Sequence, residues 1–253
     1  MNNRTLHIIG NEFTRDFYRE DPVAWWTHRL DIYEQYCLAS LKNQTNKNFV
    51  IAMTLKGYSV NFKERIEQML KDSGIKYVLR IVGEMTQEEM MSSFVNDYDI
   101  VYHTRIDTDD MFHNDVINEI QSYEYEYRQA LVYQKGYCYD VKRNKLQHYF
   151  MPGPPFSTIM FPMDVYVNEE KQEEYKQFKS HDALISAMPY LTLSENKYIV
   201  TVHGTNRITE YHDDRTILGS DHRHETEIPT TQIDSILSEF GVDSLTYKTK
   251  IQK

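Results

Sequence analysis

The sequence predicts an α/β protein with a mixed, mainly parallel sheet flanked by helices. Two observations lead to this prediction. In the first 104 residues, short apolar runs alternate with segments whose apolar residues recur at helical spacing. The chain has 253 residues, of which 40% are apolar, enough for one such domain with a sizeable core. This alternation is typical of βαβ units, in which helices cover both faces of parallel strands.

The first part of the chain supplies the strands and helices of these units. Four strands are expected, at residues 6–9, 49–53, 77–82 and 99–104. Three helices are expected between them: one with Leu30, Tyr33, Cys37 and Leu41 on one face, one over 62–70 that stops near Gly74, and one with Met90, Met91, Phe94 and Val95 on one face. The third helix opens on Thr86-Gln-Glu-Glu89, which has the form of a capping box.

The second half of the chain has a different pattern. It predicts helices over 116–123 and 182–188, and strands over 130–133, 137–141, 146–150, 157–161 and 198–202. Residues 168–179 are charged and are expected to form a solvated loop or helix surface. Thr231 to Phe240 resembles an amphipathic helix closed by Gly241. We therefore predict one domain over 1–214 and a C-terminal appendage over 215–253.

Composition limits the classes of partner. The formal net charge of −10 argues against an extended nucleic-acid surface, because phosphate neutralisation requires Lys and Arg. A diphosphate can still bind an acidic protein through a divalent cation. Cys37 and Cys138 are the only cysteines and form no Cys-x-x-Cys pair, which excludes a cysteine zinc site. No signal peptide and no apolar run of about 20 residues is present, so we expect a cytoplasmic protein without a transmembrane segment.

The strongest local motif follows the fourth expected strand, where the chain runs into Asp107, Asp109 and Asp110. In open parallel sheets, ligands bind beyond the carboxyl ends of the strands. Acids crowded there repel one another unless a cation lies among them, and Mg²⁺ or Mn²⁺ prefers carboxylate oxygens. A structural alternative is an acidic turn at the start of the next helix, which suits Asp110 best.

Haloacid-dehalogenase-like phosphatases also place Asp-x-Asp after a strand, with the first Asp as nucleophile and the second as acid and base. Two features disfavour that alternative. Met111 stands where those enzymes usually have Thr or Val, and the motif lies beyond residue 100 rather than near the N-terminus.

Several segments together resemble the rhamnosyltransferase family of glycosyltransferases with the GT-A fold. They are Trp26 to Gln44 with its ending Ser-Leu-Lys-Asn-Gln, the strand Phe49 to Thr54, Thr104-Arg-Ile-Asp-Thr-Asp-Asp-Met111, Gln134-Lys-Gly-Tyr137, Pro155-Phe-Ser-Thr158 and Val202-His-Gly-Thr-Asn206. The resemblance covers roughly residues 5–210, and the tail from about 215 has no counterpart. Thr54-Leu-Lys56 departs from it, because many relatives carry an acidic residue there.

The resemblance implies a GT-A fold and a DXD motif that binds a metal ion, Mn²⁺ or Mg²⁺. Asp109 would ligate the metal, Asp107 would contact the ribose or a metal-bound water, and Asp110 would join the metal shell or face the acceptor. His203, which follows the last expected strand, would complete the metal shell. The alternative for His203 is a histidine that is hydrogen-bonded at a strand end.

The resemblance also suggests a base for an inverting reaction. Asp182, at the start of a helix, would deprotonate the acceptor hydroxyl, and the adjacent His181 could replace it in this role. The alternative for Asp182 is a helix N-cap.

Three arginines are candidates for nucleotide contacts: Arg15, Arg29 and Arg105. Strand alternation puts Arg105 and Asp107 on one face, where a salt bridge is the structural alternative.

The sequence therefore predicts a metal-dependent glycosyltransferase that moves a sugar from a nucleoside-diphosphate sugar to a hydroxyl of a glycan or other acceptor, with inversion. The alternatives are the phosphatase and a non-catalytic nucleotide- or sugar-binding module. No motif encodes the sugar, so "rhamnosyl" is a family label.

Overall fold

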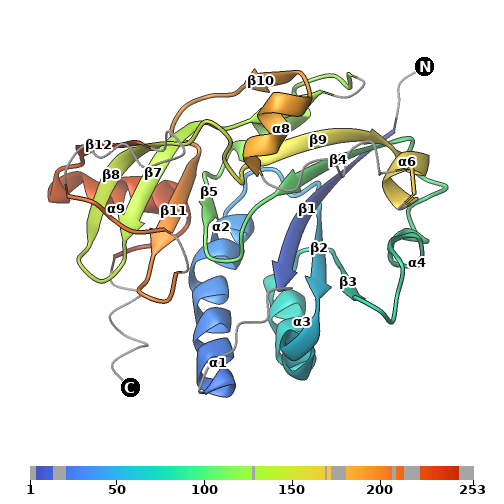
Figure 1. Cartoon of the computed structure of the whole chain (residues 1–253), viewed down its shortest axis with the longest axis horizontal. Helices are drawn as coiled ribbons and strands as arrows, with labels where there is room; N and C mark the ends of the chain where they lie inside the picture. Colours follow the sequence, from blue (N-terminus) through green and yellow to red (C-terminus); the bar gives the residue numbers. More distant parts are fainter. Residues whose placement is uncertain are drawn as a thin grey trace.

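The computed structural model describes residues 4–13, 21–126, 129–168, 170–171, 181–206, 209–213 and 223–244. Within these residues the strands form two sheets (Figure 1). The larger sheet has seven strands in the order β10-β6-β9-β4-β1-β2-β3. Their bounds are β1 (Thr5–Phe13), β2 (Val50–Leu55), β3 (Tyr77–Ile81), β4 (Ile100–Arg105), β6 (Ala130–Val132), β9 (Ser157–Pro162) and β10 (Tyr190–Thr192).

Most neighbours in the larger sheet are parallel. β3, β2, β1 and β4 run in the same direction, and β10 is parallel to β6, whereas β9 is antiparallel to both β4 and β6. The carboxyl ends of β1, β2 and β4 therefore meet at one edge, where the ligand site of an open α/β sheet is expected.

The smaller sheet has five strands in the order β12-β8-β7-β11-β5. Their bounds are β5 (Met111–Phe112), β7 (Lys135–Asp140), β8 (Lys145–Phe150), β11 (Tyr198–Val202) and β12 (Arg223–Glu227). β11 runs parallel to β7 and antiparallel to β5. Because β5 follows β4 after five residues, the chain passes from one sheet to the other directly beyond the carboxyl end of β4.

Helices cover both faces of the larger sheet (Figure 1). The helical bounds are α1 (Pro22–Ile32), a π-helical turn (Tyr33–Leu38), α2 (Ala39–Lys42), a 3₁₀ turn (Gly57–Phe62), α3 (Lys63–Ser73), α4 (Gln87–Met91), α5 (Val116–Gln121), α6 (Met163–Val167), α8 (His181–Ala187) and α9 (Thr230–Glu239). α1 and α3 pack on one face, and α4, α6 and α8 pack on the other. This arrangement confirms the predicted α/β class with a mainly parallel sheet flanked by helices.

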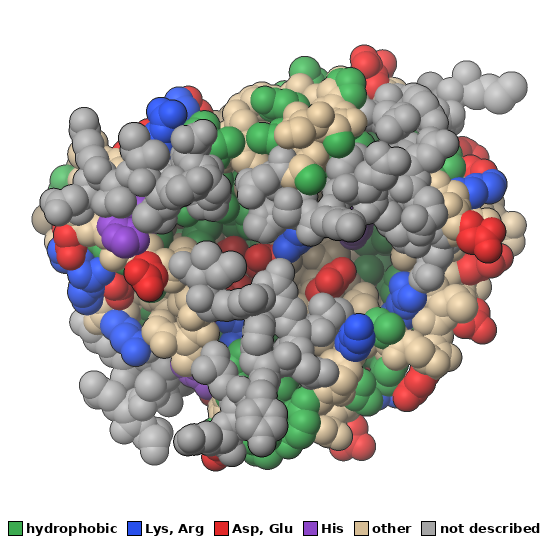
Figure 2. All heavy atoms as spheres, viewed as in Figure 1, with side chains coloured by type: hydrophobic (Ala, Val, Ile, Leu, Met, Phe, Trp, Pro, Cys, Tyr) green, Lys and Arg blue, Asp and Glu red, His purple; other side chains and the backbone are tan. Residues whose placement is uncertain are grey.

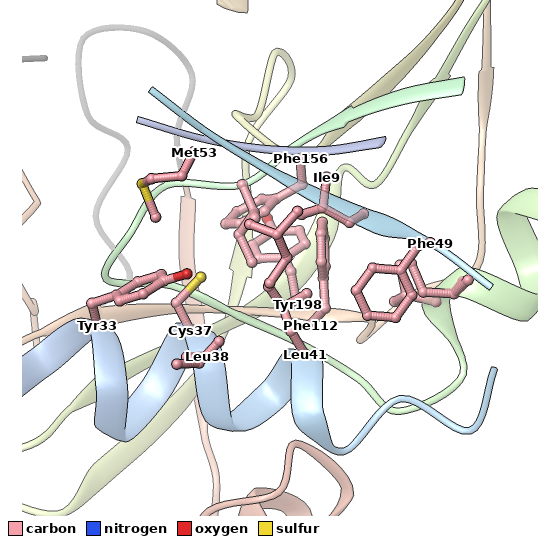
Figure 3. Close-up of a cluster of buried hydrophobic side chains, with 14 of the residues drawn as sticks. Ile9, Tyr33, Cys37, Leu38, Leu41, Phe49, Met53, Phe112, Phe156 and Tyr198 are labelled. Carbon is pink, nitrogen blue, oxygen red and sulfur yellow. The ribbon is translucent and has the colours of Figure 1, made fainter. Parts of the chain in front are cut away.

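The long helix formed by α1, the π-helical turn and α2 has two packing faces. One face contributes Leu30, Tyr33 and Cys37 to the core beneath the larger sheet, where Figure 3 shows Tyr33 and Cys37 near the strand residues Ile9 and Met53. Another face contributes Ile32 and other apolar residues to a core shared with the smaller sheet and α9. The helix is therefore fixed between the two sheets by apolar burial on two sides.

Most of the predicted elements are confirmed, with differences at specific positions. The long helix begins at Pro22 rather than near Leu30, because Asp21 caps it by accepting a hydrogen bond from the amide of Ala24 at 2.9 Å, and proline suits the first helical position. α3 ends at Gly74 with φ 71°, and the Thr86 capping box is present. The short strands β5, β10 and β12 were not expected.

The described part of the tail packs on the rest of the molecule. β12 pairs with β8, and Ile233, Leu237 and Phe240 of the α9 region are buried against Ile32 and its neighbours. None of the helices described is both long and apolar enough to cross a lipid bilayer.

Candidate active site

The pairing of β5 with β11 brings the acidic motif beside the end of β11. Ile199 pairs with Met111, so the residues before β5 run alongside the residues that follow Ile199. The Thr201 hydroxyl donates a hydrogen bond to the carbonyl oxygen of Asp109 at 2.5 Å, and the Thr201 amide donates to Asp110 Oδ1 at 3.0 Å. His203 follows β11 directly, and this pairing places it next to Asp109.

Three side chains from distant parts of the chain meet at the centre of the site. Arg29 Nη1 lies 2.8 Å from Asp109 Oδ2 and 3.2 Å from His203 Nε2, and the Asp109 and His203 atoms are 3.2 Å apart. Arg29 Nη2 donates to the hydroxyl of Thr108 at 3.2 Å. The side chains of Arg29 and Asp109 are 15% and 16% exposed, and that of His203 is fully buried. The centre is thus largely removed from water.

The loop after β11 fixes the His203 ring. Asn206 accepts a hydrogen bond from the His203 amide at 2.7 Å, and its Nδ2 donates to the carbonyl of Thr201 at 2.7 Å. Gly204 between them has φ +85°, and a Cβ there would overlap Nζ of Lys142. The His-Gly-Thr-Asn segment is therefore a compact turn that holds the imidazole in place.

His203 Nε2 lies 3.2 Å from both a donor, Arg29 Nη1, and an acceptor, Asp109 Oδ2, so its role depends on the ring tautomer. With the ring proton on Nε2, the ring donates to Asp109. With the proton on Nδ1, Nδ1 donates to the Thr205 hydroxyl at 2.9 Å and Nε2 accepts from Arg29. A histidine that ligates a metal has the second of these arrangements, with one nitrogen donating to a protein group and the lone pair of the other directed at the cation.

Asp109 is held as a carboxylate. Burial alone would raise its pKa, but the charge of Arg29 and the contacts with His203 and Arg29 outweigh this effect and hold the pKa well below the ordinary value. Burial by itself would lower the pKa of the Arg29 guanidinium, yet the neighbouring Asp109, Asp110 and Asp107 raise it. The pair is therefore fully charged.

Asp110 lies in a different environment, although it is adjacent in sequence. It is buried, and its Oδ1 accepts from the Thr201 amide rather than facing Arg29 and His203. Burial, followed by the charges of Asp109 and Asp107, raises its pKa well above the ordinary value. Their surroundings therefore lower the pKa of Asp109 and raise the pKa of its neighbour Asp110.

Asp110→Asn is therefore expected to gain stability relative to the wild type as the pH rises. The folded wild type retains a proton that the unfolded chain releases. As the pH rises from the ordinary pKa of Asp to the raised pKa of Asp110, the free energy of unfolding therefore falls by about 1 kcal/mol per pH unit. Asparagine keeps the acceptor for Thr201 and removes this titration. Urea unfolding at about pH 5 and about pH 8 measures the effect. A difference between variant and wild type that does not change with pH would contradict the raised pKa.

Asp107 and Arg105 form the outer part of the site. Their side chains lie on the same face, as alternation predicts, and Arg105 Nη2 donates to Asp107 Oδ1 at 2.9 Å. Both side chains are about two-fifths exposed, at 39% and 40%. Figure 2 shows acidic and basic side chains gathered in a hollow near the middle of the face viewed in Figure 1.

The four predicted metal ligands do not form one cluster. Across the described residues, no group of three or more His, Cys, Asp or Glu side chains is arranged to hold a metal ion. Of the four, Asp109 and His203 are in direct contact. Among the described residues, metal binding here would therefore use these two side chains.

The remaining predicted residues are less informative. Arg15 lies outside the described residues. His181 and Asp182 begin α8, but their side chains lie outside the described part of the chain. Leu184, one turn further on, packs against the face of the larger sheet opposite α1.

Sequence reasoning missed several neighbours of this centre. His28 lies edge-on to His203 with ring centroids 5.8 Å apart, and its buried Nε2 has no hydrogen-bond partner among the described residues. Burial, followed by the nearby His203, lowers the His28 pKa. Asn11, near the end of β1, donates to the carbonyl of Ile106 at 3.1 Å and thus holds the acidic loop. A polar residue shortly after an apolar run was the available signal for Asn11.

Comparison with known proteins gives one match that identifies a family. The family profile described as "Putative rhamnosyl transferase" matches residues 14–213, which is most of the chain. A search of curated proteins finds no match.

Similar solved structures include residues 1–349 of TarS from S. aureus, with 12% identity, coverage of 93% of this chain and 70% of that chain, and a TM-score of 0.42. TarS in complex with UDP-GlcNAc gives 10% identity, coverage of 93% and 71%, and a TM-score of 0.43. A cytidylyltransferase from Leptospira borgpetersenii gives 9% identity, coverage of 78% of each chain and a TM-score of 0.42.

Likenesses at this level do not assign a function, whereas the family match extends from before α1 to beyond His203 and includes the whole Asp107–Asp110 motif. The chain therefore belongs to the rhamnosyl transferase family, a family of glycosyltransferases.

Proposed function

We propose that this protein transfers a sugar, with inversion, from a nucleoside-diphosphate sugar to a hydroxyl group of a glycan or another acceptor, using Mn²⁺ or Mg²⁺. One observation carries the proposal. In a member of a glycosyltransferase family, a carboxylate oxygen of Asp109 and Nε2 of His203 lie 3.2 Å apart beyond the carboxyl end of β4. This is where an open α/β sheet binds its ligand.

Asp109 and His203 are the side chains that would hold a divalent cation here. Carboxylate oxygen is a ligand that Mg²⁺ and Mn²⁺ prefer, and His203 would add an imidazole nitrogen. Asp109 Oδ2 and His203 Nε2 are 3.2 Å apart, and Nε2 could act as a ligand when the ring proton lies on Nδ1, beside the Thr205 hydroxyl. Mg²⁺ is commonly bound through one or two protein ligands, with substrate phosphates and water filling the other positions. When bound, the cation offsets negative charge on the departing nucleoside diphosphate.

The chain's own residues have separate tasks in this mechanism. Asp107, oriented by Arg105, contacts the ribose or a water molecule near the diphosphate. Asp182 accepts the proton of the acceptor hydroxyl as its oxygen attacks the anomeric carbon, and His181 is the alternative base. The bond from the anomeric carbon to the diphosphate oxygen breaks, and the electron pair leaves with the diphosphate. A single displacement of this kind inverts the anomeric configuration.

The phosphatase alternative is disfavoured. The family match is to a transferase, and Met111, in the place of the usual Thr or Val, is a fully buried strand residue. In addition, Asp107, which would be the phosphatase nucleophile, is engaged with Arg105.

Two measurements test the proposal. One is the release of nucleoside diphosphate from UDP-, GDP- and dTDP-sugars in the presence of Mn²⁺, and the other is the melting temperature of the protein with each nucleoside diphosphate. One of the three nucleoside diphosphates is expected to raise the melting temperature by about 5 °C or more at saturation, and only with metal present. The matching nucleoside monophosphate serves as the control, because it lacks the second phosphate. A protein that binds but never turns over its donor would be the non-catalytic module, and no response to any nucleotide would refute the proposal.

A further inference from the structure

Arg29 contacts both of the side chains that are proposed to hold the cation. Its Nη1 forms a nearly equilateral triangle with Asp109 Oδ2 and His203 Nε2, with sides of 2.8, 3.2 and 3.2 Å. A neutral imidazole nitrogen has a single lone pair. In the tautomer that could bind a cation, with the proton on Nδ1, the Nε2 lone pair faces Arg29 Nη1 at 3.2 Å, so a metal ion and the guanidinium cannot use His203 at the same time.

The guanidinium is held in this position by several contacts. Nη2 donates to the Thr108 hydroxyl at 3.2 Å, and the guanidinium carbon lies 5.9 Å from the ring centroid of Trp25. The side chain is 15% exposed, and its partner Asp109 is 16% exposed, so water screens their attraction weakly. Arginine stays protonated at every accessible pH, so this competing charge is permanent.

We infer that Arg29 is an internal competitor of the divalent cation. In the protein without nucleotide, the guanidinium neutralises the charge of Asp109 and contacts His203 Nε2. The affinity of the protein for the free metal ion is therefore low. The oxygens of a nucleoside diphosphate offer the guanidinium other acceptors, for which its planar fork is well suited. Metal and diphosphate therefore bind together far better than either binds alone. The inference rests on the proposed function only for its two ligands, a divalent cation and a nucleoside diphosphate.

Arg29→Gln tests the inference, with Mn²⁺ alone as the probe and its dissociation constant measured by calorimetry. Glutamine removes the charge, so the variant is expected to bind Mn²⁺ at least about tenfold more tightly than the wild type in the absence of nucleotide. In Arg29→Lys, which retains a positive charge, the gain is expected to be smaller. Arg65→Gln is the matched control, because Arg65 pairs with Asp31 at 2.6 Å where both side chains are partly exposed.

Three results would overturn the inference: Mn²⁺ binding by Arg29→Gln no tighter than by Arg65→Gln, equal tightening in Arg29→Lys, or strong Mn²⁺ binding by the wild type alone. If Arg29→Gln does not fold, the NMR signal of the Arg29 side-chain Nε–H in the wild type is followed at saturating Mg²⁺. Displacement shifts this signal, and an unchanged signal contradicts the competition. Neither measurement depends on turnover, so failure to transfer a sugar would refute the proposed function and leave this result standing.

Discussion

Replacement of Asp109 by Asn is expected to lower the rate of sugar transfer by a factor on the order of 10²–10³. Among the described residues, Asp109 is the one carboxylate that contacts both Arg29 and His203, and its low pKa keeps it ionised. An amide has nearly the same shape but carries no charge, so it binds a divalent cation weakly. The measurement is the rate of nucleoside-diphosphate release at saturating donor, with Mn²⁺ present.

The same substitution is expected to destabilise the fold. Removing one partner of a largely buried ion pair leaves the other charge uncompensated, which typically costs about 3–5 kcal/mol. Arg29 would be left facing an uncharged amide and the His203 ring. Asp31→Asn is the control, because Asp31 is 40% exposed and its pair with Arg65 contributes about 1 kcal/mol or less. Full turnover in Asp109→Asn, in a protein shown to be folded, would remove Asp109 from the site.

The sequence predicts one half of this site well and the other half poorly, for a physical reason. The acidic motif directly follows its strand in the sequence, so the apolar run before Asp107 and Asp109 predicts that both lie at the end of a strand. Arg29 is 80 residues from Asp109, and no local pattern in the sequence pairs them. Asp21 and Pro22 do mark the start of the helix that carries Arg29, because each residue type is favoured at its position there.

The smaller sheet illustrates the same limit. The turn at residues 142–145 predicts the β7–β8 hairpin from the sequence. β5 has only two residues, which is too short for an alternation of apolar and polar side chains. Yet the pairing of β5 with β11 is what brings Asp109 to His203. The family resemblance includes the motif with Asp109 and the motif with His203 as separate segments. The pairing of β5 with β11 explains why the two motifs lie together.

Gly136→Ala is expected to destabilise the fold by disrupting the smaller sheet. Gly136 lies in β7 beside β11, and a Cβ there would lie 2.5 Å from the carbonyl oxygen of Tyr198 and 2.7 Å from two of its ring atoms. Tyr198 cannot move easily, because its ring is fully buried and stacked on Phe156 with centroids 4.0 Å apart. Its hydroxyl also donates to the carbonyl of Gln134 at 3.1 Å.

Relief of this overlap requires β11 to shift away from β7, which we expect to cost about 3 kcal/mol and to lower the melting temperature by roughly 10 °C. Gly74→Ala is the matched control. Gly74 has φ +71° and no atom within 4 Å of an added Cβ, so its cost of about 1 kcal/mol would come from backbone strain alone. Because β11 ends next to His203, Gly136→Ala should also weaken Mn²⁺ binding in the presence of the diphosphate, whereas Gly74→Ala should not. Equal melting temperatures for the two variants would mean that the contact between β7 and β11 is looser than this geometry requires.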